Sequence, residues 1–325
     1  MLIRKICILG GTGFVGRVLA NRLVRDGMKL RILTRNRERN KNSLILLPGT
    51  DLIETDVHNA DNLKQQFAGC DAVINLVGIL NERGRDGSGF RHVHVELTRK
   101  VIEACRATGI RRLLHMSALH ANAAHGPSHY LRTKGEAEDL AHLASEQGIH
   151  VTSFQPSVIF GTYDSFFNRF APLLRLWWVF PLPCYGTRMA PVHVGDVAEA
   201  MALTLKDPAS YGRRYHLCGP HIYSLEDIVR YTTHCIGVKC WIIPLNDIFS
   251  RIMAAVFDFW PGSKPISTDN YLSAKIDSIC DHNDLAQFGI TPVPIEAVVP
   301  QYLSNSIQRA RYYQMRRQSH RNTVA

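Results

Sequence analysis

The sequence contains no uninterrupted apolar stretch long enough to span a bilayer, so no transmembrane helix is predicted. A secretory leader is not expected, because residues 1–5 run directly into a strand pattern and a glycine loop. The eight cysteines include no CxxC pair, and several, such as Cys7, stand inside apolar runs. This pattern favours buried free thiols in a reducing compartment over disulfides. These absences predict a cytoplasmic protein, with peripheral contact at the inner face of the membrane as a second option.

Signals for several other classes of protein are also missing. Neither a Walker loop nor a nucleophile elbow is present. No metal site is predicted, because the frequent histidines are expected on a strand end, a loop and a helix start rather than on one face: His92, His94, His115, His120, His125 and His129. The net charge of +10 is not accompanied by an RNA-binding signature, so no nucleic-acid partner is expected. Much of the basic excess lies in residues 309–321, interpreted first as a solvated tail and second as a contact for anionic lipid or an acidic partner.

What is present is an ordinary globular composition, with 46% apolar and 20% charged residues over 325 positions. Strand-like runs at 5–9, 29–34, 51–55, 72–77, 113–117 and 150–154 alternate with helical patterns at 14–25, 62–68, 96–108 and 130–147. This alternation predicts an α/β fold, a Rossmann-type doubly wound parallel sheet with a smaller C-terminal α/β lobe. We assign residues 1–160 to an NAD(P)-binding domain, with a return segment near 188–218. Residues 161–325 then form a lobe for substrate or partner, with the basic tail.

A glycine loop follows the first predicted strand. Gly10, Gly13 and Gly16 stand in a GxxGxxG pattern that opens the first predicted helix. The glycines allow a tight turn, a close approach of the backbone to a pyrophosphate and close packing of helix on strand. The N-terminus of the helix adds free N–H groups and a positive dipole end. The predicted phosphate-binding residues are Gly10, Thr12, Gly13, Phe14, Val15 and Gly16.

The second strand bears on which dinucleotide binds. NAD sites usually end this strand with an acidic residue for the ribose 2′-hydroxyl. Here it ends in Arg35, with Arg37 nearby, which favours the 2′-phosphate of NADP(H), with NAD(H) as the alternative. The arginines could instead be solvated loop residues. The adenosine half is expected beside the ends of the third and fourth strands, at Asp56, Val57, Leu76, Val77 and Gly78, although polar residues there also serve as caps.

A candidate catalytic set lies on the helix predicted at 130–147. Tyr130 and Lys134 form a YxxxK pattern, which places them one turn apart on the same face. An ammonium beside the phenol is expected to lower the tyrosine pKa for acid–base chemistry, and the lysine could also bind the nicotinamide ribose. Ser117, at the end of the preceding strand, is expected to orient a substrate carbonyl.

Six stretches carry a resemblance to a known superfamily: GGTGFVG, LTRNR, HVHVELTRKVIEACR, YLRTKGEAE, PSVIFG and MAPVHVGDVAEA. With them the chain resembles extended or atypical short-chain dehydrogenase/reductases, the group that includes NAD-dependent epimerases and dehydratases. More narrowly, it is similar to the family of the Rossmann-fold accessory subunit of respiratory complex I, the NADH:ubiquinone oxidoreductase alpha-subcomplex subunit nine. The resemblance implies bound NADPH, with or without turnover, and adds Pro156 of PSVIFG to the cofactor-binding residues.

The departures from the superfamily pattern argue against a sugar-nucleotide substrate. Residues 155–161 lack the Arg-Pro-x-Asn type of turn usual in the epimerases, and His94 stands where an asparagine is usual. We therefore expect an NADPH-dependent oxidoreductase acting on a hydrophobic carbonyl or quinone-like substrate. The alternatives are an accessory protein of a respiratory or quinone-synthesis complex that holds NADPH without turnover, and a regulatory NADP sensor.

Two parts of the second half are singled out. The apolar stretches 166–183 and 248–260 are interpreted first as core of the lobe, and second as surface for lipid, quinone or a membrane interface. His193 and Asp196 are expected at the junction of the two parts, with Asp196 capping the next helix.

Overall fold

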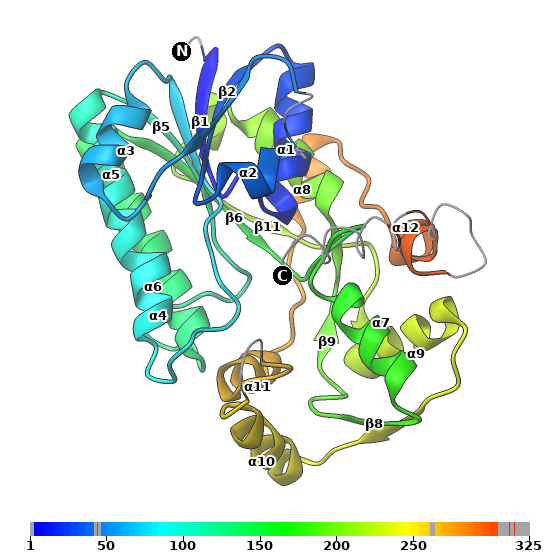
Figure 1. Ribbon diagram of the computed structural model, residues 1–325. Coiled ribbons are helices and arrows are strands. Elements are labelled where there is room, and N and C mark those ends of the chain that lie inside the picture. The colour runs from blue at the N-terminus through cyan, green and yellow to red at the C-terminus, as the bar shows by residue number, and fades with distance from the viewer. Residues whose placement is uncertain are drawn as a thin grey trace.

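The centre of the computed structural model, which describes residues 3–41, 44, 47–260, 264–304, 312 and 315, is a seven-stranded parallel sheet (Figure 1). The strand order is β11-β6-β5-β4-β1-β2-β3. The strands are β1 (Lys5–Leu9), β2 (Lys29–Thr34), β3 (Thr50–Glu54), β4 (Ala72–Asn75), β5 (Arg112–Met116), β6 (His150–Pro156) and β11 (Arg214–Leu217). The six predicted strands are confirmed, and β11 adds a seventh from the return segment.

Helices cover both faces of this sheet. Helices α1 (Phe14–Arg25) and α8 (Val194–Thr204) pack together on one face, and α3 (Ala60–Phe67), α5 (Leu97–Thr108) and α6 (His129–Leu143) cover the other. Alternate residues of β1 enter the two cores, Ile6 and Ile8 on the first face, and Cys7 and Leu9 on the second. All four are fully buried, as expected for a strand covered on both sides.

The order of the strands reverses between β1 and β4. From β1 the chain proceeds outward through β2 and β3, and then returns to β4, β5 and β6 on the other side. Short helices α2 (Arg37–Asn40) and α4 (Ser88–Arg91) follow β2 and β4. The carboxyl ends of β1 and β4 therefore border the crevice where ligands bind in open α/β sheets.

A smaller lobe lies below the sheet in the view of Figure 1. Its core includes Phe160, Phe167, Ile228 and Val299. Its elements, with the short strands that pair at its junction with the sheet, are β7 (Ile159–Phe160), α7 (Phe167–Leu176), β8 (Val179–Leu182), β9 (Arg188–Met189), β10 (Val192–His193), β12 (Tyr223–Ser224), α9 (Leu225–Ile236), β13 (Trp241–Pro244), α10 (Asp247–Phe257), α11 (Thr268–Ala274) and α12 (Ile295–Leu303). Among the described residues, no helix combines the length and apolar character needed to cross a bilayer.

The prediction that Asp196 caps α8 is wrong. The helix begins at Val194 with His193 as its N-cap residue, so Asp196 lies within the first turn, where its charge suits the helix dipole. Its Oδ2 atom instead accepts a hydrogen bond of 2.8 Å from the backbone N–H of Val293, just before α12. Asp196 therefore joins the sheet domain to the last described helix.

The prediction of free thiols is wrong for two cysteines. Cys218, which follows β11, forms a disulfide with Cys280, and the other six cysteines are free. The pair is 62 residues apart in sequence, and the chain after α11 returns to the end of β11 to bring it together. There the Asn283 side chain accepts from the Cys218 N–H and donates to the Cys218 carbonyl. Local spacing therefore contained no sign of this pair. The basic segment 309–321 lies outside the described residues, apart from Tyr312 and Met315.

Candidate active site

The glycine loop closes tightly on itself and on the end of β4. Gly10 has a φ of 76°, and a Cβ atom there would lie 3.1 Å from the Leu76 carbonyl carbon. A Cβ atom on Gly16 would come within 2.4 Å of the Gly10 carbonyl oxygen, which also accepts the Gly13 N–H at 3.0 Å. Gly13 is the N-cap residue of α1, and no side chain of the described residues caps this helix. The first turn of α1 therefore keeps its N–H groups for a ligand, as a phosphate site requires.

The remaining residues of the loop place α1 on the sheet. Thr12 is partly exposed, and Val15 packs against the core on the α1 side of the sheet. The Phe14 ring lies close to Gly161, where a Cβ atom would approach the ring to 3.2 Å. Pro156 ends β6 in a buried position, and its carbonyl accepts from the Leu119 N–H.

The end of β2 places Arg35 in solvent. Thr34 is buried as the last residue of the strand, whereas Arg35 is exposed and has no ion pair within the described part of the chain. Asn36 then caps α2 by accepting from the Arg39 N–H. At the end of β3, Asp56 is exposed and accepts from the His58 N–H, as the alternative interpretation of a turn residue expects.

The end of β4 meets the candidate catalytic helix. Asn75 is buried and its Oδ1 atom accepts from the Val77 N–H at 3.2 Å, which fixes the start of the loop. A Cβ atom on Gly78 would lie 3.0 Å from the Lys134 Nζ atom and 3.7 Å from the Nε2 atom of His94. The predicted residues Leu76 to Gly78 thus lie between the glycine loop and Lys134.

Tyr130 and Lys134 lie one turn apart on α6, as predicted, but the pKa of Tyr130 is shifted in the direction opposite to the prediction. The buried Lys134 ammonium donates to the Met116 carbonyl at 3.0 Å, and burial lowers its pKa to about 8. Burial, together with the nearby Asp269 carboxylate, raises the pKa of Tyr130 to about 12. The expected lowering of the tyrosine pKa by Lys134 is therefore not found, because burial and the Asp269 carboxylate both raise it, while the lysine points to a backbone carbonyl.

His94 links the loop after β4 to α6. It lies on a π-helical turn, His92–Glu96, and its ring contacts the Tyr130 ring edge-on at 5.6 Å between centroids. Its Nε2 atom accepts from the Ile79 N–H, so the proton is assigned to Nδ1, which lies 2.9 Å from the Thr133 hydroxyl. Burial and the Lys134 charge lower the pKa of His94 to about 2, so this histidine is neutral near pH 7.

A buried carboxylate, missed by the sequence analysis, holds Ser117. The Ser117 hydroxyl donates to Glu138 Oε2 at 2.6 Å, and the side chains of Ser153 and Gln155 donate to the same carboxylate. Glu138 is fully buried, with the Arg214 guanidinium 3.9 Å away. The one available signal was spacing, since Glu138 follows Lys134 by four residues on the same helix. Ser117 is therefore oriented by Glu138, which the prediction of a substrate-orienting serine did not include.

The second missed residue comes from the lobe. Asp269, on α11, accepts the backbone N–H groups of His129 and Tyr130 at 2.6 and 3.2 Å. Beside it, the Ser273 hydroxyl donates to Ser128, the N-cap residue of α6. The lobe thus completes the first turn of the helix that carries Tyr130.

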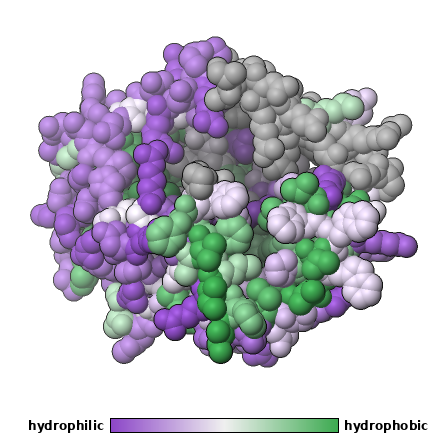
Figure 2. All heavy atoms as spheres, turned by 60° about the horizontal axis from the view of Figure 1, so that its bottom comes forward, coloured by the Kyte–Doolittle hydropathy of each residue, from purple (hydrophilic) through white to green (hydrophobic). Residues whose placement is uncertain are grey.

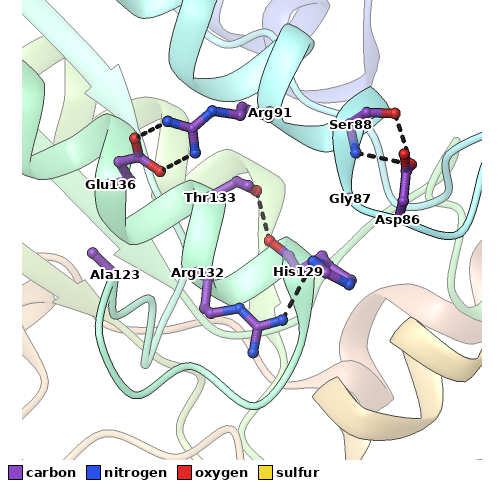
Figure 3. Close-up of a pocket in the computed structure, with 9 residues that line it drawn as sticks. All are labelled: Asp86, Gly87, Ser88, Arg91, Ala123, His129, Arg132, Thr133 and Glu136. Atoms are coloured by element: carbon purple, nitrogen blue, oxygen red, sulfur yellow. Dashed lines mark hydrogen bonds and ion pairs between the residues drawn. The ribbon is translucent and has the colours of Figure 1, made fainter.

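Two cavities lie outside the predicted site, and the first is lined in part by His129 and Thr133. One, of about 420 Å³, borders the first turns of α6, where Arg91 pairs with Glu136 and Arg132 approaches His129 (Figure 3). The other, of about 350 Å³, lies in the lobe beside Tyr271 and Lys275. Their linings include none of the predicted site residues. The crevice at the glycine loop, with its backbone geometry, is the better candidate for a dinucleotide site.

Comparison with known proteins decides the family. The model of the NAD dependent epimerase/dehydratase family matches residues 6–218. The chain belongs to this family. Its cofactor class, a nicotinamide dinucleotide, fits the loop at Gly10, Gly13 and Gly16, whose tight turn leaves no room for a Cβ atom on Gly10 or Gly16 against the neighbouring backbone.

The curated relatives of this chain include respiratory subunits and reductases. The mitochondrial NADH dehydrogenase (ubiquinone) 1 alpha subcomplex subunit 9 of Mus musculus is 29% identical, over 89% of this chain and 77% of that protein. A ceramide reductase of Caulobacter vibrioides is 27% identical, over 78% of each chain. A 4-hydroxy-2-methyl-3-oxo-4-farnesyl-3,4-dihydroquinoline-1-oxide ketoreductase of Stigmatella aurantiaca is 29% identical, over 60% of this chain and 63% of that one.

Solved structures support the fold. UDP-glucuronic acid 4-epimerase from Bacillus cereus, in complex with UDP-glucuronic acid and NAD, superposes with a TM-score of 0.69 at 18% identity. The match covers 91% of this chain and 96% of the epimerase. At this identity the likeness establishes the Rossmann-type architecture alone.

Proposed function

We infer that this protein is an NADPH-dependent reductase of a carbonyl or quinone-like group on a largely apolar molecule. The observation that carries the proposal is the grouping of Tyr130, Lys134, His94 and Gly78 at the carboxyl end of β4, beside the glycine loop. A phosphate cradle and a tyrosine–lysine pair at adjoining strand ends are the parts that hydride transfer with proton donation needs.

The cofactor preference rests on the end of β2. Arg35 is exposed there and can form charge-assisted hydrogen bonds with a 2′-phosphate, whereas the acid that would bind a 2′-hydroxyl is missing from that strand end. We therefore propose NADP(H) as the preferred cofactor, with NAD(H) as the alternative.

The protein residues divide the work of the reduction. The reduced nicotinamide supplies the hydride when it is bound. Tyr130, whose raised pKa keeps it protonated at neutral pH, donates a proton to the carbonyl oxygen. Lys134, which is buried beside Gly78, is proposed to bind the nicotinamide ribose. Ser117 donates its hydroxyl proton to Glu138, so we assign it the role of fixing the polar edge of the site rather than of donating to the substrate oxygen.

The class of substrate follows from two relatives and from the departures already described. By their names, one relative is a reductase of ceramide and the other is a ketoreductase of a 3-oxo compound that carries a farnesyl group. The turn at 155–161 also lacks the arginine and asparagine usual in sugar-nucleotide epimerases. These points support a lipid-like or isoprenoid carbonyl rather than a sugar nucleotide.

Nicotinamide fluorescence provides the test. The purified protein is titrated with NADPH and NADH, and oxidation of bound NADPH is then followed with long-chain ketones and short-chain quinones. Acceptor-dependent oxidation that falls by about 10²–10⁴-fold in Tyr130→Phe would establish the reductase. Tyr211→Phe is the matched control, because Tyr211 stacks on His150 at the opposite end of β6. Equal turnover in both variants would refute the mechanism.

A second candidate is an accessory protein that holds NADPH without turnover. The mouse respiratory-complex subunit, which aligns with most of this chain, supports it. The proposal places the protein in the cytoplasm, at the inner face of the membrane, within a respiratory or quinone-synthesis complex. Tight NADPH binding without turnover, together with co-purification of subunits of such a complex, would favour this candidate over the reductase.

A further inference from the structure

Helix α10 turns its apolar side to solvent. Ile248, Phe249, Ile252 and Val256 recur at helical spacing and are each more than half exposed. The residues that α10 buries are the small ones, Ser250 and Ala254. A helix of a globular domain normally buries its apolar stripe, so the interpretation of this stretch as lobe core is wrong for its outer side.

Neighbouring elements extend this apolar side. Strand β13 runs directly into α10 and pairs with β8, with Trp241 opposite Val179. Trp241 is 79% exposed, and Trp178, which precedes β8 and accepts the Trp241 N–H, is 85% exposed. We call the whole surface the apolar face: Leu176, Trp177, Trp178, Val179, Trp241, Ile243, Ile248, Phe249, Ile252, Val256, Phe259 and Trp260. Figure 2, in which the bottom of Figure 1 comes forward, shows apolar side chains gathered there.

Positive charge accompanies the apolar face. Arg175, Lys239 and Arg251 are exposed on its elements or next to them, and the Arg85 guanidinium lies 3.5 Å from the Phe259 ring centroid. The nearby Asp247 carboxylate is bound by Lys275 at 2.9 Å and by the Tyr271 hydroxyl at 2.6 Å. The face therefore presents apolar and aromatic side chains among basic groups.

We propose that the apolar face docks onto the surface of an anionic lipid bilayer. Aromatic and aliphatic side chains among arginines and lysines are the composition of a helix lying in a membrane interface. A second copy of the chain would bring like charges together, whereas anionic headgroups complement them. The tryptophans suit the boundary between headgroups and acyl chains.

If the protein docks in this way, the bilayer can supply the substrate of the proposed reductase. A long-chain carbonyl compound held in the bilayer would reach the protein from the lobe side without crossing water. This step rests on the proposed function, whereas bilayer binding itself does not.

The test is flotation of the full-length protein with vesicles of phosphatidylcholine, alone or mixed with phosphatidylglycerol. The protein should bind the mixed vesicles, with a blue shift of its tryptophan emission. The triple variant Ile248→Ser, Phe249→Ser, Ile252→Ser should bind about a hundredfold more weakly, since three apolar side chains no longer leave water. Arg175→Glu with Arg251→Glu should remove the preference for phosphatidylglycerol. The matched control, Leu143→Ser with Ile222→Ser, replaces exposed apolar residues elsewhere and should bind like the parent.

Three results would overturn the proposal. In the first, the parent protein binds neither kind of vesicle. In the second, the triple variant binds vesicles as the parent does, while the variant Arg316→Ser with Arg317→Ser loses binding. Sedimentation could also show a dimer that the triple variant abolishes. NADPH binding, measured in every variant, reports whether the fold is intact. Vesicle binding without turnover of any acceptor would refute the proposed reductase and leave the docking surface standing.

Discussion

The hydroxyl of Ser117 donates to Glu138 Oε2 over 2.6 Å, and both side chains are buried. Glu138 also receives hydrogen bonds from Ser153 and Gln155, so it accepts from three side chains. In Glu138→Gln, one acceptor oxygen becomes an NH₂ group that faces these donors. The free energy of unfolding should fall by about 1–3 kcal/mol, measured by urea denaturation.

The matched control for this change is Glu136→Gln on the same helix. Glu136 pairs with Arg91 at the surface, so its loss should change the free energy of unfolding by no more than about 1 kcal/mol. Equal destabilisation by the two variants would show that the buried carboxylate of Glu138 contributes no more to stability than the surface carboxylate of Glu136.

The buried Lys134 should make stability rise with pH. Its pKa is lowered from 10.5 to about 8, so between these values the unfolded chain binds more protons than the folded chain. The free energy of unfolding contributed by this group therefore increases from about pH 8 upward. In Lys134→Met this increase should disappear. Urea denaturation of both proteins between pH 7 and pH 10 measures the difference, and parallel curves would contradict it. Tyr130 changes this pH dependence only slightly. Its pKa is raised from 10 to about 12, so below pH 10 it is mostly protonated in both the folded and the unfolded chain.

Arg35 should decide the choice of dinucleotide. Replacing it with glutamate puts a negative charge where the 2′-phosphate is proposed to lie, so NADPH affinity should fall about 10–100-fold while NADH affinity changes little. Arg25→Glu, at the exposed C-terminal end of α1, makes the same change in net charge away from the crevice and is the control. Fluorescence titration with both cofactors measures the ratio. A uniform loss for NADPH and NADH would argue against a 2′-phosphate contact.

The Cys218–Cys280 disulfide should stabilise the fold under oxidising conditions. It closes a long loop, so Cys218→Ser should lower the free energy of unfolding by about 2–4 kcal/mol without reductant. In the presence of reductant, the parent and the variant should converge. Cys240→Ser, which removes a free and partly exposed thiol, should have little effect in either buffer. A difference that persisted after reduction would point to packing of Cys218 rather than to the bond.

The sheet domain was predictable because its signals are local. The periodicity of residues 5–9 and 14–25 reproduces the bounds of β1 and α1, and the glycines between them require the turn that the structure contains. The YxxxK spacing likewise placed Tyr130 and Lys134 on one helix. In each case a short window of sequence contains the whole physical cause.

The rest depends on contacts between distant segments. Asp269 reaches α6 from 139 residues away, and nothing in its own neighbourhood indicates that partner. The side chain of Lys134 could have turned to Tyr130, and only the folded arrangement shows it bound to the Met116 carbonyl. The stripe on α10 has the same spacing whether it faces a core or solvent, so its exposure could not be derived from periodicity.

The Asp269 contact also bears on where the functional unit ends. The family match stops at residue 218, yet two N–H groups of the helix with Tyr130 are satisfied by a carboxylate from residue 269. A chain cut at the family boundary would leave the opening turn of α6 without that partner. The boundary of the family match and the boundary of the candidate tyrosine site are therefore different, and the lobe belongs to that candidate site.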